Sequence, residues 1–321
     1  MNSESDYLLL RVSNIRNLTP RIRAYELRPA AGSELPLASA GSHIGIPVQL
    51  AGGKTAVRDY AICSNPLQRD FYEIAVLQTG SRRGGADYIF TSFDEGTRIE
   101  CRNPVNNFYL HADASPAMLI AGGIGIAPII AIAYTLLARG RRFELHYAGR
   151  SKNDMAFTEE LQQRFGRQLH MYPADEAKRL DIMQLLADAS GNTLFYACGP
   201  QAMLDDIETC ARLLGIAKDR VQIERFAPGR PEHDKALILE LAYTHKLIQV
   251  DADQSLLAAV RDVGINASFD CGIGDCGTCA VKILEGEAEH RDHVLSDSQK
   301  AQGFICLCVS RAKGGKLILA L

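Results

Sequence analysis

Two patterns of hydrophobic and polar residues distinguish the first two segments of the chain. Up to about residue 110, apolar residues come in short β-branched and aromatic runs separated by glycine, proline, asparagine and serine. Runs of this kind at this spacing predict a small antiparallel β-barrel. The expected strands cover residues 8–12, 21–27, 43–48, 59–62, 71–77 and 97–101.

From about residue 114 the pattern becomes an alternation of apolar strands and helical stretches. Residues 117–121 form a continuous apolar run, which leads through a glycine-rich turn into a helical stretch ending at Arg139. Such alternation is typical of a parallel sheet with helices on both faces. The later elements of the series are expected at residues 143–147, 169–171, 182–186, 194–197 and 203–214.

A polar segment with two prolines, residues 228–235, interrupts this pattern and reads as a linker. It separates the alternating segment from a smaller unit of strands and helices that holds a cluster of cysteines. We therefore expect a β-barrel domain at residues 1–112, an α/β domain at 113–227, the linker at 228–235 and an α+β domain at 236–321.

Composition is that of a soluble globular protein. The chain has 321 residues, 47% hydrophobic and 23% charged, with a net charge of −3, so several domains are expected and a nucleic-acid binder is not indicated. No stretch reaches the ~18 apolar residues of a membrane span, and the polar start lacks the features of a secretory signal. Nine cysteines without such a signal favour metal or redox chemistry in a reducing compartment, so we expect a cytoplasmic location.

The most specific chemical signal is a group of cysteines in a glycine-rich loop. Cys271, Cys276 and Cys279 have the C-x4-C-x2-C spacing of plant-type 2Fe-2S sites. Glycine lets the backbone wrap closely around an inorganic core. A structural zinc site and scattered buried cysteines are the alternatives, but zinc knuckles normally pair such a motif with a second cysteine pair. We therefore predict a 2Fe-2S cluster.

The fourth cluster ligand is either Cys306 or Cys308, far downstream. In an extended segment both side chains point to the same face, so alternation does not separate them. Residues 308–312 resemble the fourth-ligand segment of plant-type ferredoxins in reductase chains, and this resemblance favours Cys308. Cys306 is then expected to be a small buried hydrophobic residue.

A second candidate site is the glycine-rich turn after residues 117–121. Gly122, Gly123 and Gly125 allow a pyrophosphate to approach the backbone, and the following helix offers N–H donors and a positive dipole. Pro128 suits the first helical turn. The spacing is not that of the Rossmann fingerprint, so a simple tight turn is the alternative.

A second motif adds weight to this nucleotide site. Cys198, Gly199 and Pro200 follow a later strand and are expected at the same carboxyl edge of the sheet, where ligands bind in this architecture. Taken alone, the motif could simply be a buried cysteine before a helix.

A third candidate site lies in the barrel. Arg58 and Tyr60 alternate along one expected strand and project to the same face. A guanidinium suits a phosphate, and a phenol ring can cover a flavin. Residues 81–86 open an expected helix and offer a second anion site. Each motif alone could be a solvated charge or a turn, but together with the other two sites they favour a flavin phosphate.

These motifs, in this order, resemble the phthalate dioxygenase reductase family, and the resemblance covers nearly the whole chain. The family comprises flavin reductases of the ferredoxin–NADP reductase superfamily with a C-terminal plant-type ferredoxin. The resemblance implies an FMN-binding antiparallel β-barrel, an NAD-binding α/β parallel-sheet domain and a β-grasp-like α+β ferredoxin domain. It also implies an NADH-dependent reductase that passes electrons from NADH through FMN and the 2Fe-2S cluster to a separate Rieske-type terminal oxygenase.

The resemblance assigns roles to individual residues. Residues 58–61 look like the R-x-Y-S flavin motif, and residues 83–86 look like the FMN-phosphate loop. Cys198 and Glu224 would orient the nicotinamide, and Tyr60 would pack against the flavin. The implied flavin-binding residues are Arg58, Asp59, Tyr60, Ala61, Arg83, Gly84, Gly85, Ala86 and Phe226; the implied nucleotide-binding residues are Gly122, Gly123, Gly125, Pro128, Gly199 and Pro200; the implied cluster ligands are Cys271, Cys276, Cys279 and Cys308.

Two residues depart from the family pattern. Ala61 and Ala86 stand where the family has serines. Each change removes one side-chain hydrogen bond, worth ~1 kcal/mol, so the effect on FMN affinity and on hydride transfer is open.

The electron acceptor and the exact cofactors are not decided by the sequence. The acceptor could instead be a haem monooxygenase, free flavin or a quinone, and Ala61 keeps open a non-catalytic electron-relay subunit. Arg150 could meet the 2′-phosphate of NADPH, whereas the resemblance favours NADH. FMN rather than FAD rests on residues 83–86 and on the resemblance. We expect a monomer that meets its oxygenase transiently, and the substrate of that oxygenase cannot be identified from this chain.

Overall fold

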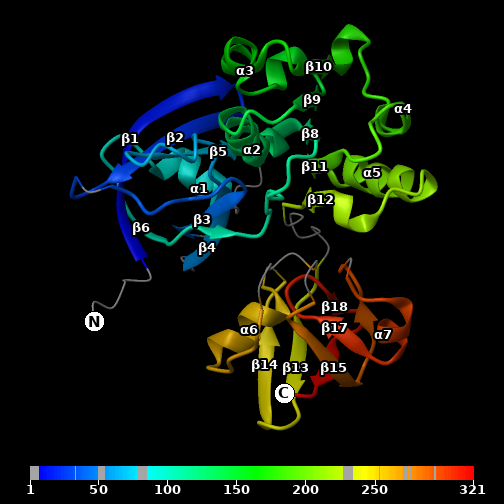
Figure 1. The fold of residues 1–321 in the computed structure, drawn as a ribbon. Helices are drawn as coiled ribbons and strands as arrows, with labels where there is room; N and C mark the ends of the chain where they lie inside the picture. Colours follow the sequence, from blue (N-terminus) through cyan, green and yellow to red (C-terminus); the bar gives the residue numbers. More distant parts are fainter. Residues whose placement is uncertain are drawn as a thin grey trace. The chain divides into compact units, whose positions relative to one another are not determined.

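The computed structural model describes residues 7–32, 34–49, 55–78, 85–226, 234–252, 254–269, 274, 277–292 and 294–321. The chain divides into two compact units, Met1–Glu224 and Arg225–Leu321, here named the N-terminal unit and the C-terminal unit (Figure 1). None of the helices in these ranges is both long and apolar enough to cross a membrane.

The first half of the N-terminal unit consists of two antiparallel sheets around a shared apolar core. Their strand orders are β5-β2-β1-β6 and β4-β3-β7. Alternate residues point into this core, such as Leu10 and Val12 on β1 and Ile44 and Ile46 on β3. The elements are β1 (Tyr7–Thr19), β2 (Ile22–Pro29), β3 (Ser42–Gln49), β4 (Thr55–Ala61), β5 (Tyr72–Leu77), α1 (Gly85–Ser92), β6 (Arg98–Arg102) and β7 (Val105–Asn106).

Each run predicted as a barrel strand is a strand in the structure, and the helix expected after residues 81–86 is α1. Strand β1 extends well beyond the predicted residues 8–12, because two register shifts let it bend while it stays paired with β2. Strand β7 was not expected, since a strand of only two residues has no alternation to detect.

The second half of the N-terminal unit is a parallel sheet with strand order β10-β9-β8-β11-β12. Every residue of the central strand β8 is buried, because the sheet is covered on both faces and needs no polar side. Leu119 packs in a core with residues of α2 and α3, whereas Ile120 packs with residues of α4 and α5. The elements are β8 (Ala117–Gly122), α2 (Ile126–Ala138), β9 (Phe143–Gly149), α3 (Thr158–Phe165), β10 (Leu169–Pro173), α4 (Ile182–Ala187), β11 (Leu194–Cys198), α5 (Gln201–Leu213) and β12 (Val221–Glu224).

The C-terminal unit is a mixed sheet with strand order β14-β13-β19-β15-β17 and a separate pair, β16-β18. Leu237, Leu239 and Leu241 alternate into its core from β13. Ser255 caps the N-terminus of helix α6, and its side chain accepts a hydrogen bond from the Ala258 N–H at 3.0 Å. The elements are β13 (Leu237–Leu241), β14 (Lys246–Val250), α6 (Leu256–Asp262), β15 (Ala280–Glu285), β16 (Ala288–Glu289), α7 (Asp297–Ala301), β17 (Phe304–Cys306), β18 (Arg311–Ala312) and β19 (Lys316–Leu319).

The architecture therefore matches the predicted fold class: antiparallel barrel sheets, a parallel α/β sheet and a small α+β unit. The boundary between the compact units falls after Glu224, earlier than the expected domain end at residue 227.

Candidate functional site

The glycine-rich turn and the Cys198 motif meet at one edge of the parallel sheet. Strands β8 and β11 are parallel neighbours, with Ala121 opposite Cys198. A side chain at Gly125 would place its Cβ 2.2 Å from the carbonyl oxygen of Cys198, and one at Gly122 would lie 2.6 Å from Cδ of Pro200. The turn after β8 and the chain after β11 can approach this closely only because these positions lack a side chain. Glycine is therefore required here for packing.

Gly123 serves a different purpose in the same turn. Its φ is +54°, in the left-handed region, and an added Cβ would meet nothing within 4 Å. The turn therefore leaves open space in front of its backbone just before α2 begins at Ile126. Pro128 lies in the first turn of α2 and is buried, as its lack of an N–H allows.

Cys198 and Glu224 form a cross-strand pair at the ends of β11 and β12. The sequence did not reveal this pairing, because it depends on the order of the strands. The Cys198 side chain is fully buried. Burial, followed by the nearby Glu224 carboxyl, raises the pKa of the Cys198 thiol well above its usual range, so the thiol stays neutral.

The Glu224 carboxyl is also neutral at moderate pH. Burial raises its pKa to about 8. Its Oε2 atom is inaccessible to solvent and has no hydrogen-bond partner within the described ranges. A protonated carboxyl can donate one hydrogen bond and accept others. Glu224 therefore offers a buried donor and acceptor that a bound ligand can satisfy.

In the barrel, the structure brings two predicted flavin motifs together. A Cβ added to Gly85, the first residue of α1, would lie 2.8 Å from Cγ of Arg58 on β4. The Arg58 stem thus lies against the start of α1, while the residue itself is exposed. Its Nη1 donates to the carbonyl of Val57 at 3.1 Å. A cation and a helix N-terminus lie side by side here, which favours an anion.

The other residues predicted to bind the flavin differ in exposure. Tyr60 packs at the edge of the barrel core, and burial above all raises the pKa of its phenol, which stays protonated. Ala61 is buried, Asp59 is exposed and Ala86 is half-buried. Arg83 and Gly84 lie outside the described residues. Phe226 is exposed and belongs to the C-terminal unit.

In the C-terminal unit, two predicted cluster ligands lie together. The Sγ atoms of Cys279 and Cys308 are 3.2 Å apart, although 29 positions separate them in the sequence. Sulfur ligands of one tetrahedral metal ion at about 2.3 Å each would be about 3.8 Å apart, so small shifts would let both sulfurs bind one ion. Cys271 and Cys276 lie outside the described residues.

Cys306 also lies close to this pair. Hydrogen bonds from the thiols of Cys306 and then Cys308 lower the pKa of the Cys279 thiol. Cys306 is fully buried and Cys308 is half-buried. The greater exposure of Cys308 agrees with its choice as the ligand. Distance to Cys279 does not distinguish Cys306 from Cys308, because both thiols lie close to it.

A buried aspartate, Asp292, lies next to the segment that contains Cys308. Asp292 accepts hydrogen bonds from the Ser310 hydroxyl at 3.0 Å and from the Leu295 N–H at 3.1 Å. A Cβ on Gly274, whose φ is +87°, would lie 3.0 Å from Cα of Asp292 and 2.8 Å from Cγ2 of Val309. A side chain at Gly274 would therefore collide with the chain next to Cys308.

Comparison with known families agrees with this division of the chain. Residues 242–313 match the model of the 2Fe-2S iron-sulfur cluster binding domain, which confirms the predicted ferredoxin domain. Residues 97–221 match the model of the dimethylamine monooxygenase subunit DmmA-like, N-terminal domain.

Full-length relatives and solved structures are also similar to the chain. It is 39% identical to the heme-dependent oxidative N-demethylase beta subunit of Ectopseudomonas mendocina (strain ymp), over 99% of this chain and 100% of that protein. It is 35% identical to the carnitine monooxygenase reductase subunit of Acinetobacter baumannii, over 97% of this chain and 96% of that protein. The solved structure of phthalate dioxygenase reductase, described as a modular structure for electron transfer from pyridine nucleotides to [2Fe-2S], superposes with a TM-score of 0.84 at 30% identity, and the match covers 98% of both chains.

The buried Glu224 carboxyl predicts a distinctive dependence of stability on pH. Its pKa is raised from 4.5 to about 8, so the folded state holds this proton more tightly than the unfolded chain. The resulting stabilisation is fully present below about pH 4.5, falls as pH rises and is lost by about pH 8. Over this window, we expect the free energy of unfolding of the wild type to fall by up to about 1.4 kcal/mol per pH unit relative to Glu224→Gln. Urea unfolding across the window measures this. Glu159→Gln, at an exposed position, should keep the wild-type profile; parallel profiles for wild type and Glu224→Gln would contradict the prediction.

If Cys308 is the fourth cluster ligand, substitutions of Cys306 and Cys308 should have different effects on the cluster. We expect Cys308→Ser to abolish the 2Fe-2S cluster, because it removes a ligand, and Cys306→Ser to retain it. Iron analysis and the visible absorption of anaerobically purified protein measure the loss. A cluster that survives in Cys308→Ser but not in Cys306→Ser would make Cys306 the ligand.

Proposed function

Since the chain belongs to the phthalate dioxygenase reductase family, we propose that it is the NADH-dependent reductase of a two-component oxygenase, passing electrons through FMN and the 2Fe-2S cluster to a separate Rieske-type terminal oxygenase. That it is an oxidoreductase follows from relatives that are reductase subunits of oxygenase systems. The observation that carries the finer proposal is the contact of the glycine turn with the Cys198 motif beside Glu224, in a chain that also has a 2Fe-2S domain.

The residues at the sheet edge fit a dinucleotide. The open space before Gly123 and the start of α2 suit a pyrophosphate. The neutral Glu224 carboxyl, with its unpartnered Oε2 among the described residues, complements a carboxamide, which also both donates and accepts hydrogen bonds. Cys198 lies next to it as a compact neutral thiol that limits how deeply a ring can enter.

The residues on the barrel fit a flavin phosphate. Arg58 supplies a cation next to the N-terminus of α1, and Tyr60 supplies a neutral aromatic surface on the same strand. Ala61 and Ala86 bring no side-chain hydrogen bond to this site, so backbone N–H groups have to supply that bonding. FMN and NADH, rather than FAD and NADPH, are part of the proposal.

The chemistry of two-electron and one-electron exchange belongs to the cofactors, which would be held by these residues when bound. Cys279 and Cys308 would hold the cluster together with Cys271 and Cys276. The chain's own contribution is to position the nicotinamide with Glu224 and Cys198 and to exclude water with the fully buried end of β11.

One observation favours a second acceptor. A relative with 39% identity over its full length is a heme-dependent oxidative N-demethylase beta subunit. The second candidate is therefore a haem-dependent monooxygenase in place of a Rieske oxygenase, with the same electron path inside this chain. NADH oxidation coupled to purified terminal oxygenases of both kinds, with free flavin and quinone as controls, distinguishes the acceptors. Coupling to the haem partner alone would exclude the Rieske assignment, and no NADH:ferricyanide turnover would instead indicate a non-catalytic relay subunit.

Cys198 gives a direct test of the nucleotide site. We expect Cys198→Ala to slow flavin reduction by NADH about tenfold, because the loss of one contact worth ~1.4 kcal/mol removes orientation of the nicotinamide. Anaerobic stopped-flow absorbance measures this rate. Cys101→Ala changes another buried cysteine, in the barrel core, and should leave the rate unchanged. An unaltered rate in Cys198→Ala would remove the proposed role.

A further inference from the structure

A group of metal-binding side chains lies on the parallel sheet, separate from the residues assigned above. Glu144 and His146 come from β9, and His170 comes from the edge strand β10. His146 and His170 are directly opposite in the register, and Ile120 of β8 is opposite His146 on the other side. Alternation along β9 puts Glu144 and His146 on one face of the sheet.

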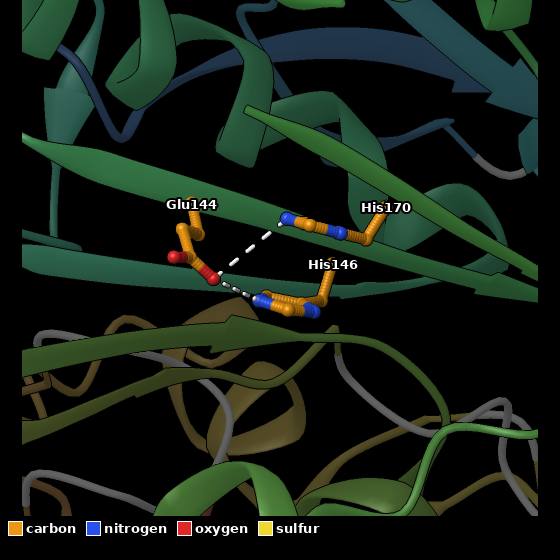
Figure 2. A group of neighbouring side chains, drawn as sticks. All are labelled: Glu144, His146 and His170. Carbon is orange, nitrogen blue, oxygen red and sulfur yellow. Dashed lines mark hydrogen bonds and ion pairs between the residues drawn. The ribbon is translucent and has the colours of Figure 1, made fainter. Parts of the chain in front are cut away.

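The side chains converge on a small volume (Figure 2). Oε2 of Glu144 lies 3.2 Å from Nε2 of His146 and 3.7 Å from Nε2 of His170. One ligand atom from each residue lies within 4.8 Å of the others. Three ligand atoms at about 2.0–2.2 Å from one tetrahedral ion are about 3.4 Å apart. The distances from Oε2 of Glu144 to the two histidine nitrogens, 3.2 Å and 3.7 Å, lie on either side of this value.

His146 is held in place by a partner outside the group. It is almost fully buried, and its Nδ1 lies 2.9 Å from the hydroxyl of Tyr172 on β10. A tyrosine hydroxyl can accept as well as donate, so Nδ1–H can donate to it and leave the Nε2 lone pair facing Glu144. Metal-binding histidines usually donate their second N–H in this way, which fixes both tautomer and ring orientation.

His170 provides the adjustable ligand. Its ring stacks on that of His146 with centroids 4.7 Å apart and an angle of 9° between the planes. Parallel rings cannot both aim a lone pair at one ion, so one ring has to turn. The His170 side chain is 45% exposed and free to rotate toward solvent, whereas His146 is packed.

We propose that Glu144, His146 and His170 form a binding site for a divalent transition-metal ion, with Zn²⁺ as the best match. Two imidazoles and one carboxylate are a ligand set that zinc takes up with three protein ligands and water in the remaining position. Hard cations such as Mg²⁺ and Ca²⁺ prefer all-oxygen sites, so this set selects against them. The bound ion would join β9 to the edge strand β10 and stabilise that edge of the sheet.

The test uses the cluster-loaded holoenzyme, so that the cluster cysteines are occupied. Titration with Co²⁺ and Zn²⁺, followed by visible absorption and by metal analysis after dialysis, should reveal one ion per chain in addition to the cluster iron. The Co²⁺ complex should have the visible absorption bands of a tetrahedral site with nitrogen and oxygen ligands. Zn²⁺ should also raise the thermal unfolding midpoint of the wild type.

Matched variants locate the ion. His170→Gln and Glu144→Gln alter exposed side chains, and each should weaken Zn²⁺ binding at least about tenfold and remove the thermal shift. His245→Asn removes an exposed histidine of the C-terminal unit, at a left-handed position that asparagine tolerates, and should bind like wild type. Tyr172→Phe removes the orienting hydroxyl and should weaken binding about 10–100-fold. No additional ion in the wild type, or equal affinity in wild type, His170→Gln and Glu144→Gln, would overturn the proposal.

Discussion

The candidate nucleotide site depends on a close backbone contact between two loops at the edge of the parallel sheet. Gly122 and Gly125 let the turn after β8 touch the chain after β11, and any Cβ at these positions would collide with Pro200 or with the backbone of Cys198. The pairing of β11 with β8 places Cys198 opposite Ala121, the glycines make room for this arrangement, and the next strand, β12, places Glu224 beside Cys198. The absence of side chains at these glycines thus permits residues from three separate strand ends to meet.

The same arrangement explains why two titratable groups remain neutral there. Strand β11 lies inside the parallel sheet and is buried along its whole length, so Cys198 at its end lies in an environment of low polarity. Glu224 is on the edge strand β12, next to Cys198, and its Oε2 atom is inaccessible to solvent. Burial raises the pKa values of both Cys198 and Glu224. The candidate site on the barrel differs, because Arg58 is exposed and places a cation at the surface. The chain thus presents neutral polar groups where a ring would bind and a cation where a phosphate would bind.

Much of this could be predicted from local sequence patterns. Short β-branched and aromatic runs bounded by turn residues located the barrel strands, and the continuous apolar run at residues 117–121 located β8. The cysteine motif is also local, so its spacing indicated cluster chemistry, and the 2Fe-2S domain at residues 242–313 is confirmed. The glycine turn did not have the Rossmann spacing, so it indicated a nucleotide only together with the Cys198 motif. The Cys198–Glu224 pair and the His146–His170 pair could not be predicted, because both depend on the strand order β10-β9-β8-β11-β12. The choice between Cys306 and Cys308 also could not be made from spacing, since both thiols approach Cys279.

The 3.2 Å approach of the Cys279 and Cys308 sulfurs has a consequence for maturation of the protein. A thiol whose pKa is lowered is more often a thiolate, and a thiolate beside a second cysteine is the reactant from which oxidants generate a disulfide. In a newly made chain without iron, this pair would therefore be close enough to be oxidised to a disulfide at the position where the cluster binds. Cofactor delivery then competes with air, and the yield of active protein depends on iron and sulfide reaching these cysteines first.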